Sequence, residues 1–284
     1  MAGIHWLASY PKSGNTWLRA FICNLRADRE SPLGINELDS DRIASDRRWI
    51  DETLGFSSAD LTWDEIEMLR PAVYRWFMAR PYTGYHKVHD AWTRASDGTP
   101  LFDAGGCSGV VYVLRNPLDL AASFANHRGT DVDEAIALMG DPQAALSDMA
   151  HQLRRQTRQR LLTWSGHVRS WLDHSGLRCH VLRYEDMLAR PQEVFAAAAD
   201  FLGLPAEPER VARAVRHSSF AELSGQEAAG GFRERPIVAE RFFRRGARGG
   251  WREELTPEQV ARIVDDHGEV MARFGYLDAQ GRPC

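Results

Sequence analysis

Two lysines are the first candidates for chemistry in this chain. Lys12 and Lys87 are the only lysines among 35 basic residues, so arginine serves wherever a surface cation is sufficient. An ammonium is a compact, mobile charge, whereas a guanidinium is a rigid planar fork, so a site that follows charge along a breaking bond favours lysine. His89 stands two residues after Lys87, and an imidazole can accept a proton near neutral pH.

The segment around Lys12 has the composition of an anion-binding loop. Residues 11–17 read Pro-Lys-Ser-Gly-Asn-Thr-Trp, between an apolar run and a helical pattern at 16–26. Gly14 lets the backbone approach an anion, while the neighbouring side chains supply donors. A helix N-terminus after such a loop suits phosphate or sulfate. Because the lysine precedes the only glycine, the loop is not a Walker A motif.

The elements that must position these residues indicate an α/β fold. Apolar runs predict buried strands at 4–9, 84–89, 109–114 and 179–184, with helical patterns between them. This alternation predicts one domain, residues 1–284, with a central parallel β-sheet flanked by helices and a P-loop-like nucleotide-binding core. The strand at 109–114 ends in Arg115 rather than in a carboxylate, which favours direct binding of anionic oxygens over binding through a metal.

Other segments carry weaker patterns. Residues 62–65 fit a capping box that opens a helix, and we expect Pro71 to bend or end that helix. Residues 142–173 read as a long helix with mostly solvated arginines, and residues 26–58 and 224–250 read as loops or short turns.

Composition narrows the class of protein. The net charge of -4 and the pI near 6.2 argue against a general nucleic-acid or membrane-surface binder. No apolar run approaches membrane-spanning length and no secretory leader is evident, so we expect a cytoplasmic protein. Four scattered cysteines read as reduced thiols. The arginine-rich stretch 233–252 has the glycines of a closing lid, which favours a nucleotide lid over a grip on nucleic acid.

Five segments, in order, resemble the cytosolic-type sulfotransferases (sulfotransferase domain 1), which use 3′-phosphoadenosine 5′-phosphosulfate (PAPS) as donor. Residues 10–17 resemble the family's 5′-phosphosulfate loop, and 111–117, with Ser123 eight residues after Arg115, resemble its 3′-phosphate strand and helix. Residues 183–187 and 217–220 are similar to its Tyr-Glu-Asp strand end and adenosine-side turn, and 244–251 to its C-terminal Arg-Lys-Gly loop. Lys87-Val88-His89 resembles the strand end that carries the family's catalytic histidine.

The resemblance implies a role for each matching residue. His89 would act as general base, Lys12 would meet the bridging oxygen, and Lys87 would polarise the sulfuryl oxygens. The remaining donor-binding candidates follow from the motifs: Ser13, Gly14, Asn15, Thr16 and Trp17 at the 5′-phosphate; Arg115, Ser123, Arg244, Arg245 and Gly246 at the 3′-phosphate; and Trp17, Tyr184, Ser218 and Phe220 at the adenosine. No metal is expected.

The resemblance therefore predicts an enzyme that moves a sulfuryl group from PAPS to a hydroxyl, less often an amine, of a small molecule. Two other classes stay open: a kinase using ATP and magnesium, and a silent protein that binds nucleotide without turnover. The arginine-rich composition points to a bacterial source and to secondary metabolism.

Acceptor identity and oligomeric state also stay open at this stage. Stretches around 49–56, 76–85, 92, 124–129 and 224–243 could line an acceptor cavity, although their aromatic residues could equally lie in the core. The family's C-terminal dimer motif is not intact, because Thr256 is followed by Pro257 and Ala261 stands at the motif's glutamate position.

Overall fold

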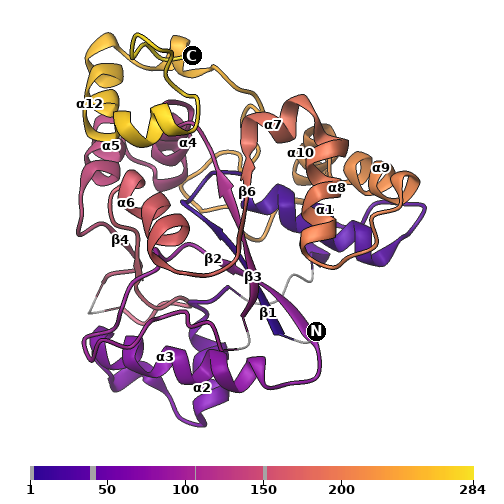
Figure 1. Cartoon of the computed structure of the whole chain (residues 1–284), viewed down its shortest axis with the longest axis vertical. Helices are drawn as coiled ribbons and strands as arrows, with labels where there is room; N and C mark the ends of the chain where they lie inside the picture. The colour runs from indigo at the N-terminus through magenta and orange to yellow at the C-terminus, as the bar shows by residue number, and fades with distance from the viewer. Residues whose placement is uncertain (1–2, 39–42, 106, 150–151) are drawn as a thin grey trace. The chain divides into compact units, whose positions relative to one another are not determined.

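The computed structural model describes residues 3–38, 43–105, 107–149 and 152–284 (Figure 1). Its central element is a four-stranded sheet with the order β2-β1-β3-β6. The strands are β1 (Gly3–Ser9), β2 (Thr83–Val88), β3 (Cys107–Leu114) and β6 (Cys179–Arg183). Strands β1 and β2 pair in parallel, with Gly3 opposite Thr83 and Ala8 opposite Val88. The predicted α/β class, with a parallel sheet flanked by helices, is confirmed, as are all four predicted strands.

Helices lie between and after the strands along the chain. They are α1 (Asn15–Ala27), α2 (Arg47–Leu54), α3 (Trp63–Met78), α4 (Pro117–Arg128), α5 (Val132–Gly140), α6 (Trp164–Arg169), α7 (Tyr184–Ala189), α8 (Pro191–Phe201), α9 (Pro208–His217), α10 (Phe220–Gly230), α11 (Trp251–Glu254) and α12 (Pro257–Arg273). Shorter elements are η1 (Ile35–Glu37), η2 (Ser58–Asp60), the π-helical η3 (Ser170–His174), and the paired two-residue strands β4 (Ala145–Leu146) and β5 (Gln159–Arg160).

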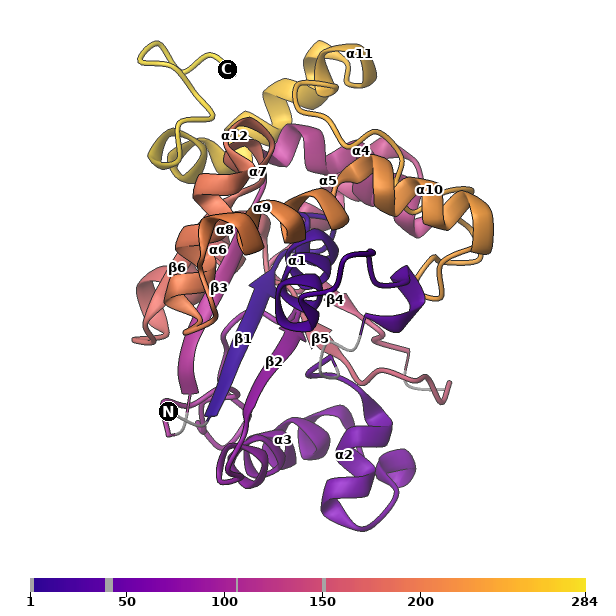
Figure 2. The ribbon, with the colours of Figure 1, turned by 90° about the vertical axis from the view of Figure 1, so that its right-hand side faces the viewer.

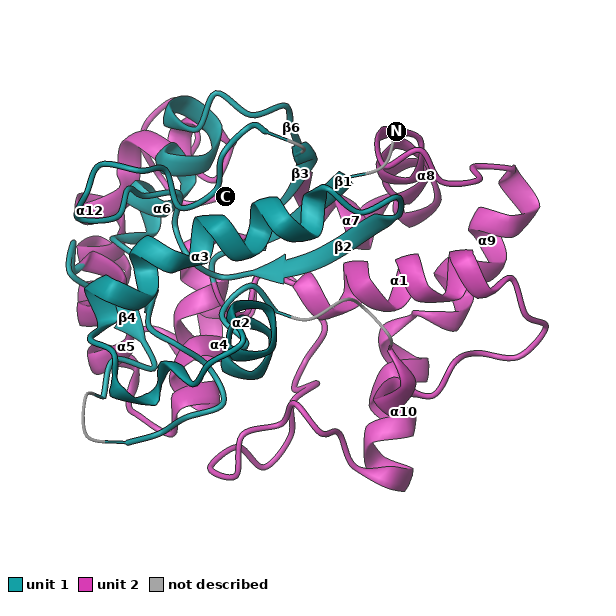
Figure 3. Ribbon diagram, turned by 90° about the horizontal axis from the view of Figure 1, so that it is seen from below, with its two compact units in different colours: residues 1–10, 41–112, 141–180 teal, residues 11–40, 113–140, 181–284 magenta. Residues whose placement is uncertain are grey.

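The chain divides into two compact units (Figure 3). Unit 1 comprises residues 1–10, 41–112 and 141–180, and unit 2 comprises residues 11–40, 113–140 and 181–284. The prediction of one domain over the whole chain stays a prediction.

Unit 1 is built around an aromatic core. The ring of Trp6 on β1 lies edge-on to Tyr74 of α3 at 5.0 Å and to Phe102 at 4.9 Å, and α3 packs against β1. Trp49, one of the possible acceptor-wall aromatics, is 2% exposed and stacks on His86 at 4.6 Å. Trp49 is therefore a core residue.

Unit 2 contains two groups of packed helices. In the first, α1 packs against α9, α9 against α8, and α8 against α7, and Figure 2 shows α1, α8 and α9 side by side. In the second, α4 packs against α5, and α12 contacts both. Gly14 directly precedes α1, and Arg115 lies two residues before α4, so each group presents one helix N-terminus close after a predicted binding residue.

Two predictions of local structure need correction, and a third is contradicted in part. Thr62 and Glu65 form the predicted capping box, but α3 does not end at Pro71 and continues to Met78. A proline removes one backbone donor, yet the helix continues because Val73 and Tyr74 beyond it are buried in the core. Residues 26–58 contain α2, and residues 224–250 begin inside α10, so neither stretch is entirely loop.

The long helix predicted for residues 142–173 was wrong. The structure has β4, β5, α6 and η3 there. Backbone groups of this segment bond to distant parts of unit 1, since the amide of Thr157 donates to the Ser45 carbonyl and the Arg160 carbonyl accepts from Ala91. Arg158 is not a solvated arginine either, because its side chain is 18% exposed and forms ion pairs with carboxylates of α3.

Two predictions about the whole chain can also be compared with the structure. All four cysteines are free thiols, as predicted. Within the described residues, no helix combines the length and apolar character needed to cross a membrane.

Candidate active site

The loop that begins unit 2 has a constrained backbone. Lys12 has φ 68° and Gly14 has φ 107°, both in the left-handed region that side chains disfavour. A Cβ at Gly14 would lie 2.7 Å from Cδ2 of Tyr184, so this position requires glycine. Helix α1 begins at Asn15, and the Gly14 carbonyl accepts from the amide of Trp17 at 2.9 Å. The first N–H groups of a helix lack intrahelical partners and attract anions.

Ser13 carries the clearest sign of a ligand in this loop. The residue is 1% exposed, and its Oγ has no hydrogen-bond partner within the described residues. A buried hydroxyl without a partner is destabilising and rare in native structures. An anionic oxygen at the start of α1 would satisfy it.

Lys12 is covered by a segment from far along the chain. Its Nζ lies 3.7 Å from the ring centroid of Phe242, a cation–π contact. Phe242 belongs to the segment 231–250 between α10 and α11, and this segment is held in place by a buried carboxylate. The backbone amides of Phe242 and Phe243 donate to Glu227 at 2.7 and 2.9 Å.

Arg115, directly after β3, joins the loop to the C-terminal segment. One terminal nitrogen donates to the Lys12 carbonyl at 3.1 Å, and the other to the Ala247 carbonyl at 3.4 Å. The guanidinium lies 4.4 Å from the ring centroid of Tyr184. Burial raises the pKa of Tyr184, although Arg115 opposes that shift, so the ring stays protonated.

The backbone after Arg115 is fixed by Glu185. Its carboxylate accepts from the amide of Asn116 at 2.9 Å and from the hydroxyl of Tyr276 at 2.9 Å. Glu185 is buried, so these bonds are shielded from water. Its observed contacts support the position of the β3 strand end.

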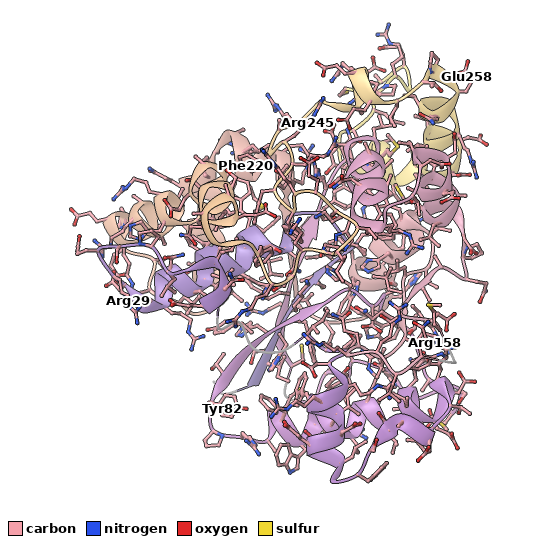
Figure 4. All side chains as sticks on the ribbon, turned by 180° about the vertical axis from the view of Figure 1, so that it is seen from behind. Arg29, Tyr82, Arg158, Phe220, Arg245 and Glu258 are labelled. Carbon is pink, nitrogen blue, oxygen red and sulfur yellow. The ribbon has the colours of Figure 1, made fainter. Side chains whose placement is uncertain are left out.

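Gly246 and Phe220 meet closely. Gly246 has φ 60°, and a Cβ there would lie 2.1 Å from Cδ2 of Phe220. Figure 4 shows Phe220 beside the segment that carries Arg245. Trp17 lies edge-on to Tyr184 at 5.8 Å, and Ser218 is buried with its hydroxyl donating to the Ala214 carbonyl at 2.8 Å.

The other predicted residues of unit 2 are also located. Asn15 and Thr16 are buried in the first turn of α1, and Ser123 is half-buried on α4. Arg244 and Arg245 form ion pairs with Glu254 of α11. Within unit 2, Arg115 thus contacts Lys12 and Tyr184, Tyr184 lies against Gly14, and Gly246 lies against Phe220.

In unit 1, His89 follows β2 and is oriented by the end of β1. Its Nδ1 lies 2.9 Å from the Ser9 carbonyl oxygen and 3.3 Å from Ser9 Oγ. A carbonyl can only accept, so Nδ1 carries a proton, and in the neutral form of the ring the lone pair lies on Nε2. This tautomer suits a general base. Lys87 is half-buried on β2, opposite Leu7 in the parallel register.

The backbone of His89 is held by residues that sequence reasoning missed. The Nε2 of His167 donates to the His89 carbonyl at 3.0 Å, and Nδ1 of His167 accepts from the Tyr112 hydroxyl at 2.7 Å. Burial lowers the pKa of His167 to about 4, so the ring is neutral at neutral pH. No local sequence pattern marks this pairing, because 78 residues separate the two histidines.

The next residue, Asp90, is also anchored. Arg70 of α3 donates to both of its carboxylate oxygens, at 2.8 and 2.9 Å, and both side chains are almost fully buried. The indole of Trp171 donates to the Asp90 carbonyl at 2.9 Å. The strand end that carries Lys87 and His89 is therefore rigidly supported. Across the described residues, no cluster of three or more histidine, cysteine or acidic side chains could hold a metal ion.

Comparison with known proteins identifies the class. The family model for the sulfotransferase domain matches residues 5–275, so the chain belongs to the sulfotransferase family. The predicted family and enzyme class, a sulfotransferase, are thereby confirmed.

Curated relatives agree with this assignment. Sulfotransferase 2A6 of Rattus norvegicus is 24% identical over 275 residues, covering 94% of this chain and 84% of the relative. Cytosolic sulfotransferase 1 of Arabidopsis thaliana is 25% identical over 271 residues, covering 90% of this chain and 75% of the relative.

Solved structures share the fold. Mouse sulfotransferase SULT7A1, complexed with PAP, superposes with a TM-score of 0.60 at 19% identity, covering 98% of this chain and 87% of that one. Retinol dehydratase, in complex with androsterone and the inactive cofactor PAP, gives a TM-score of 0.57 at 18% identity, covering 94% and 80%.

Proposed function

We propose that this sulfotransferase uses PAPS as donor and transfers its sulfuryl group to a hydroxyl of a small-molecule acceptor. The observation that carries the proposal is the buried hydroxyl of Ser13, just before α1, which has no hydrogen-bond partner in the part of the chain that the structure describes. The loop also has a glycine that lies against Tyr184, and Arg115 donates to its backbone. These features suit a bound phosphosulfate. Solved relatives that carry PAP support the choice of donor.

Each residue predicted to bind the donor has a proposed role. Backbone amides from Gly14 to Trp17, with the side chains of Ser13, Asn15 and Thr16, hold the 5′-phosphate. Arg115, Ser123, Arg244, Arg245 and Gly246 bind the 3′-phosphate, and Trp17, Tyr184, Ser218 and Phe220 contact the adenosine. Arg115 has the strongest support, because both terminal nitrogens already contact backbone carbonyls of the two segments it would join around the nucleotide.

The proposed reaction is an in-line displacement at sulfur. The acceptor oxygen forms a bond to sulfur as the bond from sulfur to the bridging oxygen of the donor breaks. The acceptor proton passes to Nε2 of His89, and the electron pair of the broken bond stays on the 5′-phosphate, which leaves as part of 3′-phosphoadenosine 5′-phosphate (PAP). Lys12 offsets the charge that develops on the bridging oxygen, and Lys87 polarises the sulfuryl oxygens. No metal takes part in this scheme.

The acceptor is proposed only as a class. The names of relatives include hydroxysteroid sulfotransferases of Cavia porcellus, and one solved relative is complexed with androsterone. We therefore expect a small hydroxyl compound with an apolar body. The relative named as cytosolic supports a cytoplasmic location for the reaction.

One experiment separates the possible functions. The purified chain is incubated with PAPS carrying labelled sulfur and a panel of phenols, hydroxysteroids and aliphatic alcohols, and label in the acceptor is measured. Label transfer is the expected result. Tight binding of PAP with no transfer across the panel would instead indicate a silent nucleotide-binding protein. A parallel incubation with magnesium and ATP labelled at its γ-phosphate tests the third class, and transfer in that incubation alone would indicate a kinase.

A further inference from the structure

Glu254, the last residue of α11, is paired with the arginines proposed for the 3′-phosphate. The two terminal nitrogens of Arg244 donate to different carboxylate oxygens of Glu254, at 2.6 and 2.8 Å. The Nε of Arg245 lies 3.0 Å from the same carboxylate. The Glu254 side chain is only 16% exposed, so solvent screens these contacts incompletely.

The paired hydrogen bonds between Arg244 and Glu254 are of the kind that Arg244 would form with a phosphate. A guanidinium binds carboxylate and phosphate through the same pair of parallel N–H groups, so the edge of Arg244 that holds Glu254 cannot hold a phosphate simultaneously. We propose that Glu254 is an internal competitor for the 3′-phosphate, displaced when the nucleotide binds and returning when it leaves. The inference rests on the proposed function, because it assumes that Arg244 and Arg245 bind the donor.

The surrounding contacts keep Glu254 close to the arginines. The amides of Gly249 and Trp251 donate to the carboxylate of Asp119, at 2.7 and 3.0 Å, which anchors the start of α11 to α4. Glu254 itself lies at the C-terminal end of this four-residue helix. Its side chain can therefore leave Arg244 without detaching the helix from Asp119.

Glu254 remains charged under ordinary conditions. The hydrogen bond from Arg244 holds the pKa of the Glu254 carboxyl below its usual value of 4.5, and the nearby charges of Arg245 and Arg115 act in the same direction. A neutral side chain of the same size would bind Arg244 much more weakly. It would then compete less with the 3′-phosphate, and PAP would dissociate more slowly.

The test is Glu254→Gln in the full-length chain, with two nucleotides as probes. The dissociation constants of PAP and of adenosine 5′-phosphate, which lacks the 3′-phosphate, are measured by calorimetry. Since an exposed or half-buried ion pair contributes up to about 1 kcal/mol, we expect E254Q to bind PAP about threefold to fivefold more tightly. Affinity for adenosine 5′-phosphate should be unchanged.

Glu258→Gln is the matched control. Glu258 is an exposed carboxylate in the first turn of α12, so the substitution removes the same charge four residues further along the chain. Figure 4 shows Glu258 away from Arg245 within unit 2. E258Q should bind PAP as the wild type does, and a thermal melt of both variants checks that they are folded.

The outcomes distinguish this inference from the proposed function. Absence of PAP binding by the wild-type chain would overturn the proposed function and the inference with it. If the wild type binds PAP while E254Q binds it equally or more weakly, Glu254 orients the arginines rather than competing for them, and only the inference fails. If E254Q binds PAP and adenosine 5′-phosphate more tightly by the same factor, or if E258Q binds PAP as tightly as E254Q does, the effect comes from net charge alone. Either result would also overturn the inference.

Discussion

Replacement of His167 tests whether a buried neutral histidine supports the strand end that carries the proposed base. His167 joins the His89 carbonyl to the Tyr112 hydroxyl, and all three groups lie in unit 1. In His167→Gln, the amide nitrogen can still donate to His89, but the acceptor for Tyr112 is lost or poorly placed. We expect the variant to be about 1–3 kcal/mol less stable at pH 7, the cost of a buried hydroxyl whose proton has no acceptor, although its oxygen keeps the backbone hydrogen bond with Tyr10.

The pH dependence gives a sharper signature. Burial lowers the pKa of His167 from its ordinary 6.5 to about 4 in the folded chain, so between these values the unfolded chain binds the extra proton. Stability from this residue is therefore fully present above pH 6.5 and is lost as the pH falls towards 4. At about 1.36 kcal/mol per pH unit of separation, the loss reaches about 3 kcal/mol. Glutamine does not titrate, so H167Q lacks this loss.

The assay is urea unfolding at a series of pH values from 7 to 4, followed by tryptophan fluorescence. The gap in unfolding free energy between wild type and H167Q should narrow by about 3 kcal/mol over this range and can change sign. His5 and His267, whose pKa values burial also lowers to about 4, are present in both proteins and cancel in the difference. Tyr112→Phe is the control, because it removes the hydroxyl but keeps the titrating ring.

A gap that stays constant from pH 7 to pH 4 would refute the reasoning, since His167 would then bind its proton equally in both states. The same conclusion would follow if the difference in unfolding free energy between wild type and Tyr112→Phe narrowed with falling pH as much as the difference for H167Q. Turnover adds a second readout. H167Q should lower kcat more than it raises the KM for the donor, because it disturbs the backbone of His89 and leaves the donor loop intact.

Three further predictions concern the proposed donor site and base. His89→Ala should lower kcat by about 10²–10⁴-fold with unchanged PAP affinity, and near-wild-type turnover would remove His89 from the mechanism. Ser13→Ala should weaken PAP binding about fivefold while leaving the melting temperature the same or higher, because it removes a buried hydroxyl that has no partner in the described protein. Gly246→Ala should weaken PAP binding at least about tenfold, since the new Cβ would lie 2.1 Å from Phe220 at a φ of 60°, and calorimetric affinity equal to wild type would show that the segment adapts.

Local pattern was enough to predict the strand and helix on either side of the loop that carries Lys12. The strand, loop and helix around Lys12 are contiguous in the chain, and a glycine beside donors before a helical pattern has few conformations that bury the strand and turn the chain into the helix. The capping box at Thr62 formed for the same reason, because both of its hydrogen bonds join residues three apart. Membership of the sulfotransferase family could also be predicted, because short motifs and their order along the chain are properties of the sequence itself.

Distant pairings could be decided only by tertiary structure. The contacts of His167 with His89 and of Arg70 with Asp90 join residues that no local pattern relates, and each exists because burial forces polar groups to find partners. The same principle explains the failure at 142–173, where backbone groups bond to other parts of unit 1 rather than along a helix. The sequence thus determined which residues could bind and react, whereas the packed core determined which of them are held in place.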